Sequence, residues 1–264
     1  MAHTVLQTSL GVFALVLGMS VGAAAQDQSE RYERLKADAA RGDTDAMYEL
    51  GEMYYLGTQA RHGGPERDTE RGVELFRPLA EAGHARAQWR LGWAYEMGSG
   101  VERDAETAYR LYTDSAGQGF IHAKQTLGKL YIDGRGTPPD YDRAYTLLSE
   151  AAEADVVRAM TDLARLYQDP ERGPVHHPSR AVHWFRMSAE QNQPAGVRGL
   201  SEVYLNGIGV ERDPVAALRV YVEYEERTGR AQITALLRLL AQLSDADRAL
   251  VDQVAEAENW LSDE

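Results

Sequence analysis

The sequence predicts an all-α solenoid of about five helix hairpins, on the strength of two recurring patterns and one absence. The pattern Ala-x-x-x-Leu-Gly-x-x-Tyr, or a close variant, occurs five times, and its tyrosines are Tyr54, Tyr95, Tyr131, Tyr167 and Tyr204. A second column, small–x3–large–x3–small, follows each copy, as in Ala108–Tyr112–Ala116. No strand-like alternation of polar and apolar residues appears in the chain.

Each repeat is expected to form two helices, A and B. Helix A carries the Leu-Gly-x-x-Tyr face, and helix B carries its three residues at i, i+4 and i+8, which places them on one stripe. The small residues let the two helix axes approach closely, and the Tyr or Phe fills the space beside them. One hairpin cannot bury both of its apolar faces, so the hairpins are expected to stack on one another.

The turn between the two helices explains two nearly identical stretches, GSGVERD at 98–104 and GIGVERD at 207–213. Gly-x-Gly alone suggests a phosphate-binding loop, but a dinucleotide fingerprint needs a preceding strand and a third glycine. The first glycine instead suits the C-terminus of helix A, in the left-handed region. The aspartates that follow suit the N-cap of helix B. They are Asp68, Asp104, Asp140 and Asp213, and Pro214 then occupies the first helical position.

The two ends of the chain differ from the repeats. Residues 10–26 are an apolar run that ends in Ala23-x-Ala25, which predicts a signal peptide over 1–25 and a mature N-terminus at Gln26. No Lys or Arg precedes the run, and the alternative is a buried N-terminal helix. Residues 26–42 are expected to form a capping helix, and residues 230–264 a C-terminal helical cap. In that cap, Ser244 and Asp247 have the spacing of a capping box.

These combined columns resemble Sel-one-like repeats (SLRs), which are relatives of the tetratricopeptide repeat. The resemblance covers 43–229, and the expected repeats are 43–83, 84–119, 120–155, 156–192 and 193–229. It implies a right-handed α-solenoid that binds other proteins or acts as a scaffold, and bacterial exported members look like adaptors, envelope-assembly factors and regulators of sensor kinases. The fourth repeat departs from the pattern, because "DPERGPVHHPS" replaces its glycine turn.

Composition narrows the partners. The chain carries 28 basic and 41 acidic residues, a net charge of −13, which disfavours nucleic acid and anionic membrane surfaces. It contains no cysteine, and this excludes disulfides, thiolate catalysis and lipid attachment through an N-terminal cysteine. After signal cleavage we therefore expect no membrane insertion, and a periplasmic or secreted location.

Catalytic and metal-binding motifs are absent from the sequence: it has no S-x-x-K, no H-E-x-x-H and no G-x-S-x-G. His176, His177 and His183 lie within eight residues and could ligate Zn²⁺, but a solvent-exposed loop followed by a helix surface is the favoured explanation. Pro178 leaves their geometry unfavourable. We predict no catalytic residue, no cofactor and no metal.

The expected functional surface is the groove lined by the A helices. By resemblance to tetratricopeptide proteins, its positions lie five and two residues before the Leu-Gly leucine, and two and five residues after it. We call this the groove rule. Among these, aromatic and basic residues are the types enriched at binding hot spots. They are Tyr48, Tyr55, Arg86, Trp89, Trp93, Lys129, Arg158, Arg165 and Arg198. The alternative is that the aromatics pack between helices and the basic bias is chance.

The prediction is a non-catalytic periplasmic adaptor that binds a protein segment with acidic and apolar residues in this groove, and that regulates an envelope signalling or assembly partner. The alternative is an envelope hydrolase or a cell-wall ligand-binding protein of the SLR type. The lack of a nucleophile–base motif favours the first.

Overall fold

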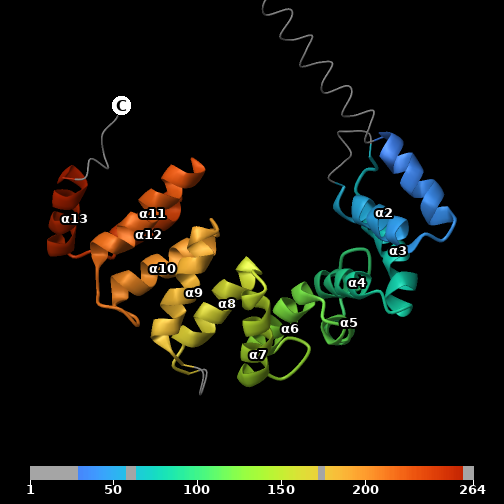
Figure 1. Ribbon diagram of the computed structural model, residues 1–264, viewed down its shortest axis with the longest axis horizontal. Helices are drawn as coiled ribbons and strands as arrows, with labels where there is room; N and C mark the ends of the chain where they lie inside the picture. Colours follow the sequence, from blue (N-terminus) through green and yellow to red (C-terminus); the bar gives the residue numbers. More distant parts are fainter. Residues whose placement is uncertain (1–28, 58–63, 172–175, 258–264) are drawn as a thin grey trace, which may run out of the picture. The chain divides into compact units, whose positions relative to one another are not determined.

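The computed structural model describes residues 29–57, 64–171 and 176–257, and this described part is helical, without strands (Figure 1). The predicted signal peptide and Gln26 lie outside the described residues. Contacts divide the chain into two compact units, residues 1–120 (unit 1) and residues 121–264 (unit 2). Within the described ranges, no helix combines the length and the apolar character needed to cross a membrane. The predicted all-α class is confirmed.

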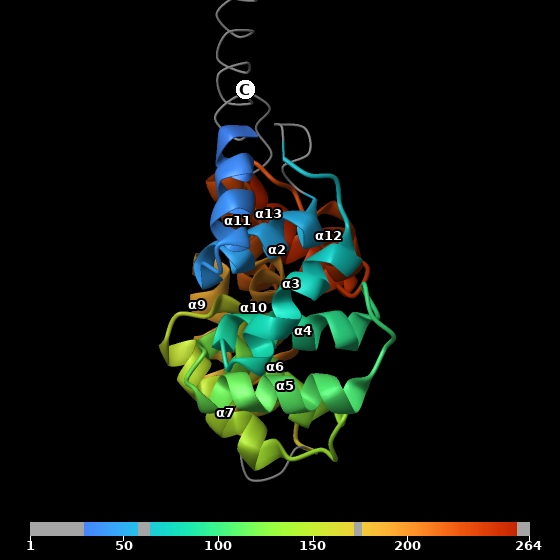
Figure 2. The same cartoon turned by 90° about the vertical axis from the view of Figure 1, so that its right-hand side faces the viewer.

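Unit 1 begins with a helix over residues 29–40 and continues with two hairpins. Its helices are α2 (Thr44–Leu56), α3 (Thr69–Glu81), α4 (Ala85–Met97) and α5 (Ala105–Gly117). Each of these four helices packs against the next, and Figure 2 shows α4 and α5 side by side. The unit is centred on the fully buried ring of Phe76, which lies 5.6 Å from the ring of Tyr48 and 5.9 Å from that of Tyr55.

Unit 2 contains three hairpins and two further helices. They are α6 (Ile121–Asp133), α7 (Tyr141–Glu153), α8 (Val157–Gln168), α9 (Pro178–Glu190), α10 (Pro194–Asn206), α11 (Pro214–Thr228), α12 (Ile233–Leu240) and α13 (Asp245–Ala257). The A helices α6, α8 and α10 contact one another in order. Leu148 and Phe185 from the B helices are buried together with Leu163 and Val197 from the A helices. One continuous core therefore runs through the three hairpins.

The Leu-Gly glycine of helix A allows close contact with the large residue of helix B. A Cβ atom on Gly51 would lie 2.6 Å from Cε1 of Phe76, closer than real Cβ contacts. In the fourth and fifth repeats Ala164 and Ser201 take this position, and both are buried. Gly199, directly before the leucine of the fifth repeat, instead allows α10 to approach Phe185 of the fourth repeat. The sequence columns are thus contact rules for the hairpin, as expected from their spacing.

The predicted turn geometry is confirmed at both copies of G-x-G-V-E-R-D. Gly98 and Gly207 are C-caps with φ of 67° each, in the left-handed region. Asp104 caps α5 by accepting from the backbone N–H of Thr107, and Asp213 caps α11 through Ala216. Asp68 and Asp140 cap α3 and α7 in the same way, and Pro214 is the first residue of α11. The glycine-rich stretch is a joint between helices.

The terminal helices complete the cores. In unit 1, Leu35 packs with Ala46 and Met53, and the half-buried Ala39 joins this cluster. In unit 2, Leu239 of α12 and Val251 of α13 are buried in the main core. The capping box is confirmed, since Asp247 N–H donates to Ser244 Oγ and Ser244 N–H donates to Asp247 Oδ2, each at 3.1 Å.

Candidate protein-interaction site

Two of the predicted groove residues in unit 1 are core residues. Tyr48 and Tyr55 lie on α2 and are each 4 % exposed. Tyr48 packs against Phe76 and against the ring of His84, at a centroid distance of 5.4 Å. Burial raises the pKa of the Tyr48 phenol. These two side chains therefore do not form a surface for a partner, because the wide rings fill the space between α2 and its neighbours.

The other predicted residues of unit 1 lie on α4 and cover this core. Arg86 is exposed, and its guanidinium lies over the Tyr48 ring at 4.5 Å. Trp89 is half-buried and makes an edge contact with Phe120, with ring centroids 5.7 Å apart. Trp93 is half-buried and packs against the core cluster that contains Tyr48 and Phe76. The aromatic residues of α4 thus pack within the unit and expose part of their rings.

A charged pair joins the two A helices of unit 1, and the groove rule selected only one of its members, Glu52. Arg90 of α4 donates two hydrogen bonds to the Glu52 carboxylate of α2, and the side chains are only 15 % and 21 % exposed. Burial by itself lowers the pKa of Arg90, but the hydrogen bonds and negative charge of Glu52 outweigh it and raise that pKa. The Arg90 guanidinium also lies 4.8 Å from the Trp89 ring centroid.

In unit 2 the predicted groove residues are basic and reach the solvent. Arg158 and Arg165 are two helical turns apart on α8, so they share one face, and both are exposed. Arg198 of α10 is exposed, while Lys129 of α6 is half-buried and lies 3.5 Å from Asp133. Among the described residues, Arg158, Arg165 and Arg198 have no carboxylate within ion-pair distance. We call Lys129, Arg158, Arg165 and Arg198 the basic face.

Asp162 of α8 is the second residue that the groove rule missed. Its carboxylate accepts a hydrogen bond of 2.8 Å from Gln125 Nε2 of α6, and so links two neighbouring A helices. Burial raises the pKa of Asp162, and the Gln125 hydrogen bond and the charges of Lys129 and Arg165 only partly oppose it. Lys129 and Arg165 therefore both act electrostatically on the Asp162 carboxylate.

Arg90 and Asp162 occupy the same position of helix A, and this position is visible in the sequence. Each stands directly before the Leu-Gly leucine or its equivalent, Leu91 and Leu163. The groove rule skips this position. A charged residue beside a buried leucine column nevertheless indicates a helix-to-helix contact, since an unpaired charge there would be costly.

The three histidines do not converge. His177 packs against the Tyr167 ring at 6.3 Å, and His183 packs against Trp184 at 5.2 Å. Throughout the part of the chain that the structure describes, no three His, Asp or Glu side chains are grouped so that they could hold a metal ion.

Stacked helix hairpins with charged and aromatic A-helix positions define a helical-repeat protein. A family model described as "Sel1 repeat" matches residues 44–84, 85–120, 126–156, 157–193 and 194–219. The chain therefore belongs to the Sel1 repeat family, as its resemblance to SLRs indicated. Proteins of this family generally mediate protein–protein interactions and generally serve as non-catalytic scaffolds.

Solved structures show the same fold. A protective antigen of uropathogenic Escherichia coli with an SLR fold is 28 % identical, with a TM-score of 0.65 over 78 % of this chain and 42 % of that one. A Sel1 repeat protein from Oxalobacter formigenes is 27 % identical, with a TM-score of 0.64 over 78 % of this chain and 83 % of that one. The chain thus spans less than half of the first relative. A comparison with curated proteins gave no match.

Proposed function

We propose that this chain is an exported interaction module whose basic face binds an acidic segment of a protein partner. One observation carries the proposal: three exposed arginines on neighbouring A helices of unit 2 have no carboxylate within ion-pair distance among the described residues. In a chain of net charge −13, a basic surface differs in sign from the whole. Such a surface attracts acidic partners and repels most others.

The chemistry of the basic face favours carboxylates. A guanidinium can donate two parallel hydrogen bonds to a carboxylate, and it loses little hydration when it does so. Asp162 sets a limit on the partner, because an acidic group placed directly over it would meet a like charge. The acidic segment is therefore expected to contact Arg158 and Arg165 on either side of this carboxylate. The periplasm is the proposed compartment, from the predicted signal peptide at 1–25.

The test is a crosslinking capture from the periplasmic fraction of cells that express the chain with its own N-terminus. The double variant Arg158→Glu/Arg165→Glu is expected to lower the yield of crosslinked partner about tenfold or more, since it turns attraction into repulsion. The control is Arg230→Glu, an exposed arginine outside the basic face whose replacement changes the charge in the same direction.

Three results would contradict the proposal. One is an equal yield from wild type and the double variant. Another is an equal loss with Arg230→Glu, which would indicate a general effect of charge. The third is a chain found only in the cytoplasm, which would overturn the proposed export and leave the basic face to be tested with cytoplasmic partners.

A further inference from the structure

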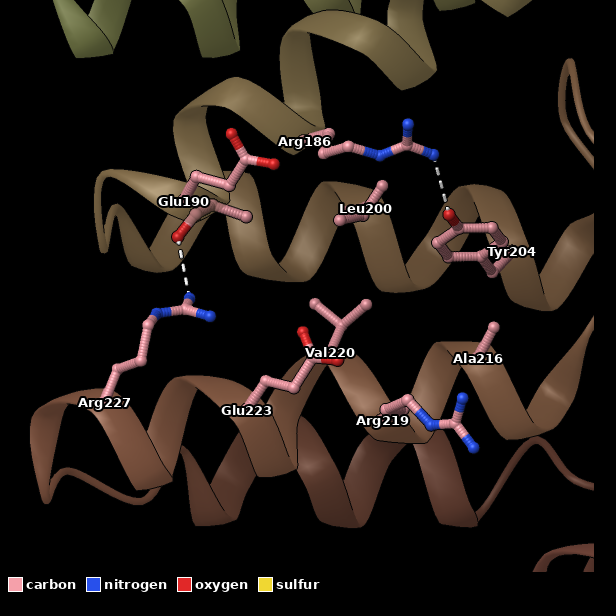
Figure 3. Close-up of a pocket in the computed structure, with 10 residues that line it drawn as sticks. Arg186, Glu190, Leu200, Tyr204, Ala216, Arg219, Val220, Glu223 and Arg227 are labelled. Carbon is pink, nitrogen blue, oxygen red and sulfur yellow. Dashed lines mark hydrogen bonds between the residues drawn. The ribbon is translucent and has the colours of Figure 1, made fainter.

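A second candidate site lies in unit 2, between the B helices α9 and α11 and the A helix α10. A cavity of about 320 Å³ opens between α9, α10 and α11 (Figure 3). Leu200 of α10 and Val220 of α11 form its apolar middle, and the Tyr204 ring lies at one end. Its volume is at the lower limit for small-ligand sites. We call it the α9–α11 slot, and it contains none of the four residues of the basic face.

Three arginines line the α9–α11 slot, and two of them are held by neutral acceptors. Arg186 donates to the Tyr204 hydroxyl at 3.0 Å. Arg227 donates to the Ala189 carbonyl at 3.0 Å and to Asn192 Oδ1 at 3.1 Å. A phenol fixes the Arg186 guanidinium without neutralising it, so its positive charge remains available to a ligand, whereas Arg227 is held against the end of α9 by its two acceptors.

The slot has two electrically different ends. Figure 3 shows Arg219 on the same side as Arg186 and Tyr204, and Glu190 and Glu223 toward the side of Arg227. One end therefore presents guanidinium groups beside a phenol. The other presents two carboxylates and one guanidinium. Leu200 and Val220 separate the ends, so the slot runs from basic through apolar to acidic.

The same framework exists in unit 1 and shows what is particular to the slot. Every slot residue has a counterpart 109 positions earlier in the chain, and Arg77 donates to Tyr95 at 3.2 Å as Arg186 does to Tyr204. The counterpart of Arg227 is Gln118, whose side chain is already bonded to Gln88. The Arg–Tyr hydrogen bond is thus shared by both units, whereas Arg227 has a glutamine as its counterpart in unit 1.

From this arrangement we propose that the α9–α11 slot binds a short protein segment with an acidic, an aliphatic and a basic side chain in succession. The ligand's carboxylate lies between Arg186 and Arg219, beside the Tyr204 hydroxyl. Its aliphatic group covers Leu200 and Val220, and its cation lies at Glu190 and Glu223. Because the slot and the basic face share no residue, the chain can hold two partner segments at once, as an adaptor requires.

The probe is the acetylated, amidated tetrapeptide Glu-Leu-Leu-Lys, titrated into isotope-labelled full-length protein and followed by NMR. Signals of α9, α10 and α11 are expected to shift, together with the side-chain Nε–H signals of the arginines. The matched peptide Gln-Leu-Leu-Lys is expected to bind about tenfold more weakly, because it loses the charge-assisted hydrogen bonds.

Variants assign the carboxylate contact. Arg186→Gln and Arg219→Gln are each expected to weaken binding of the acidic probe about tenfold, with an unchanged melting temperature as the folding check. Arg77→Gln removes the equivalent arginine of unit 1 and is expected to leave the affinity unchanged. Arg165→Glu on the basic face is also expected to have no effect, so the slot and the proposed function succeed or fail separately.

The proposal is overturned by any of four outcomes. These are no shift at about 10 mM peptide, a range beyond the millimolar affinities that weak sites reach; equal binding of the two peptides; shifts confined to other helices; and full affinity in both Arg186→Gln and Arg219→Gln. If both arginine variants unfold, Tyr204→Phe keeps the charges and removes one hydroxyl, and a loss of affinity smaller than about tenfold is then the expected result.

Discussion

The A helices of the two units use the same sequence columns for different purposes. In unit 1, the position two before the Leu-Gly leucine is Tyr48 or Trp89, and these rings fill the space between helices. In unit 2, the same position is Gln125, Thr161 or Arg198. Of these three, Arg198 is exposed and Thr161 is buried. This column thus adds wide rings to the core in unit 1, and in α10 it adds an exposed arginine.

The charges follow the same division. The Glu52–Arg90 pair of unit 1 is largely buried and lies beside the Trp89 ring. Asp162 of unit 2 receives an amide hydrogen bond from Gln125, and Lys129 and Arg165 act on it without forming an ion pair at short range among the described residues. A paired charge in unit 1 stabilises a helix contact. The Arg165 guanidinium of unit 2 has no carboxylate at ion-pair distance among the described residues, so its charge remains available for binding.

The largest expected effect is on stability and separates the two units. Tyr48→Ala is expected to lower the free energy of unfolding of unit 1 by about 3 kcal/mol, because it leaves a cavity beside Phe76. Arg165→Ala in unit 2 is expected to change stability by less than about 0.5 kcal/mol, since the side chain is exposed. Hydrogen exchange read by mass spectrometry in increasing urea gives the two values separately.

Tyr48→Phe is the control, because it keeps the ring and removes only the hydroxyl. A small loss with Phe and a large one with Ala identify packing as the cause. If Tyr48→Ala were as mild as Arg165→Ala, the contrast between a packed and an exposed A-helix column would be wrong.

A smaller effect is expected from opening the charged pair of unit 1. Glu52→Gln leaves the largely buried Arg90 guanidinium without its carboxylate and is expected to lower stability by about 2 kcal/mol. Glu202→Gln is the matched change in unit 2, at the same position of helix α10, and its side chain is exposed. It is expected to cost less than about 0.5 kcal/mol.

A double variant separates the pair from its surroundings. In Glu52→Gln/Arg90→Met no guanidinium is left without a partner, so part of the loss from Glu52→Gln should be recovered. Urea unfolding of the four proteins completes this cycle. Equal losses from Glu52→Gln and Glu202→Gln would show that the Glu52–Arg90 pair contributes no more than an exposed charge.

Sequence reasoning predicted the hairpins well because repetition makes each column visible several times. Asp104 and Asp213 were predicted to be N-caps, and Gly98 and Gly207 helix ends, because each recurs at the same place in several repeats. The same periodicity placed Tyr112 on the stripe that faces the neighbouring helix, as the large residue between Ala108 and Ala116, and Tyr112 is fully buried.

The site was predicted less well, because the groove rule predicts the direction in which a side chain points but not how deeply it is buried. It selected Tyr48 and Arg165 by equal logic, yet the first is 4 % exposed and the second reaches solvent. Depth depends on the size of side chains from several helices at once. The α9–α11 slot was missed for a similar reason, since its arginines come from two B helices that no single motif joins.

The smallest expected effect concerns pH and tests the electrostatics of the basic face. Burial raises the pKa of Asp162, so folded protein binds this proton more readily than unfolded protein does. The resulting contribution to stability is fully present below the unfolded pKa of about 3.9 and is lost as pH rises through the folded value. Asp162→Asn keeps an acceptor for Gln125 and removes the titration. The stability of wild type relative to this variant should therefore fall between about pH 4 and neutral pH. Urea unfolding of unit 2 at several pH values measures this difference directly, because every other carboxyl group is common to both proteins.

A difference that rises with pH would mean that Lys129 and Arg165 stabilise the Asp162 carboxylate more than burial destabilises it. The basic face would then be partly neutralised from within, and Arg165 would be a poorer contact for an acidic partner than Arg158.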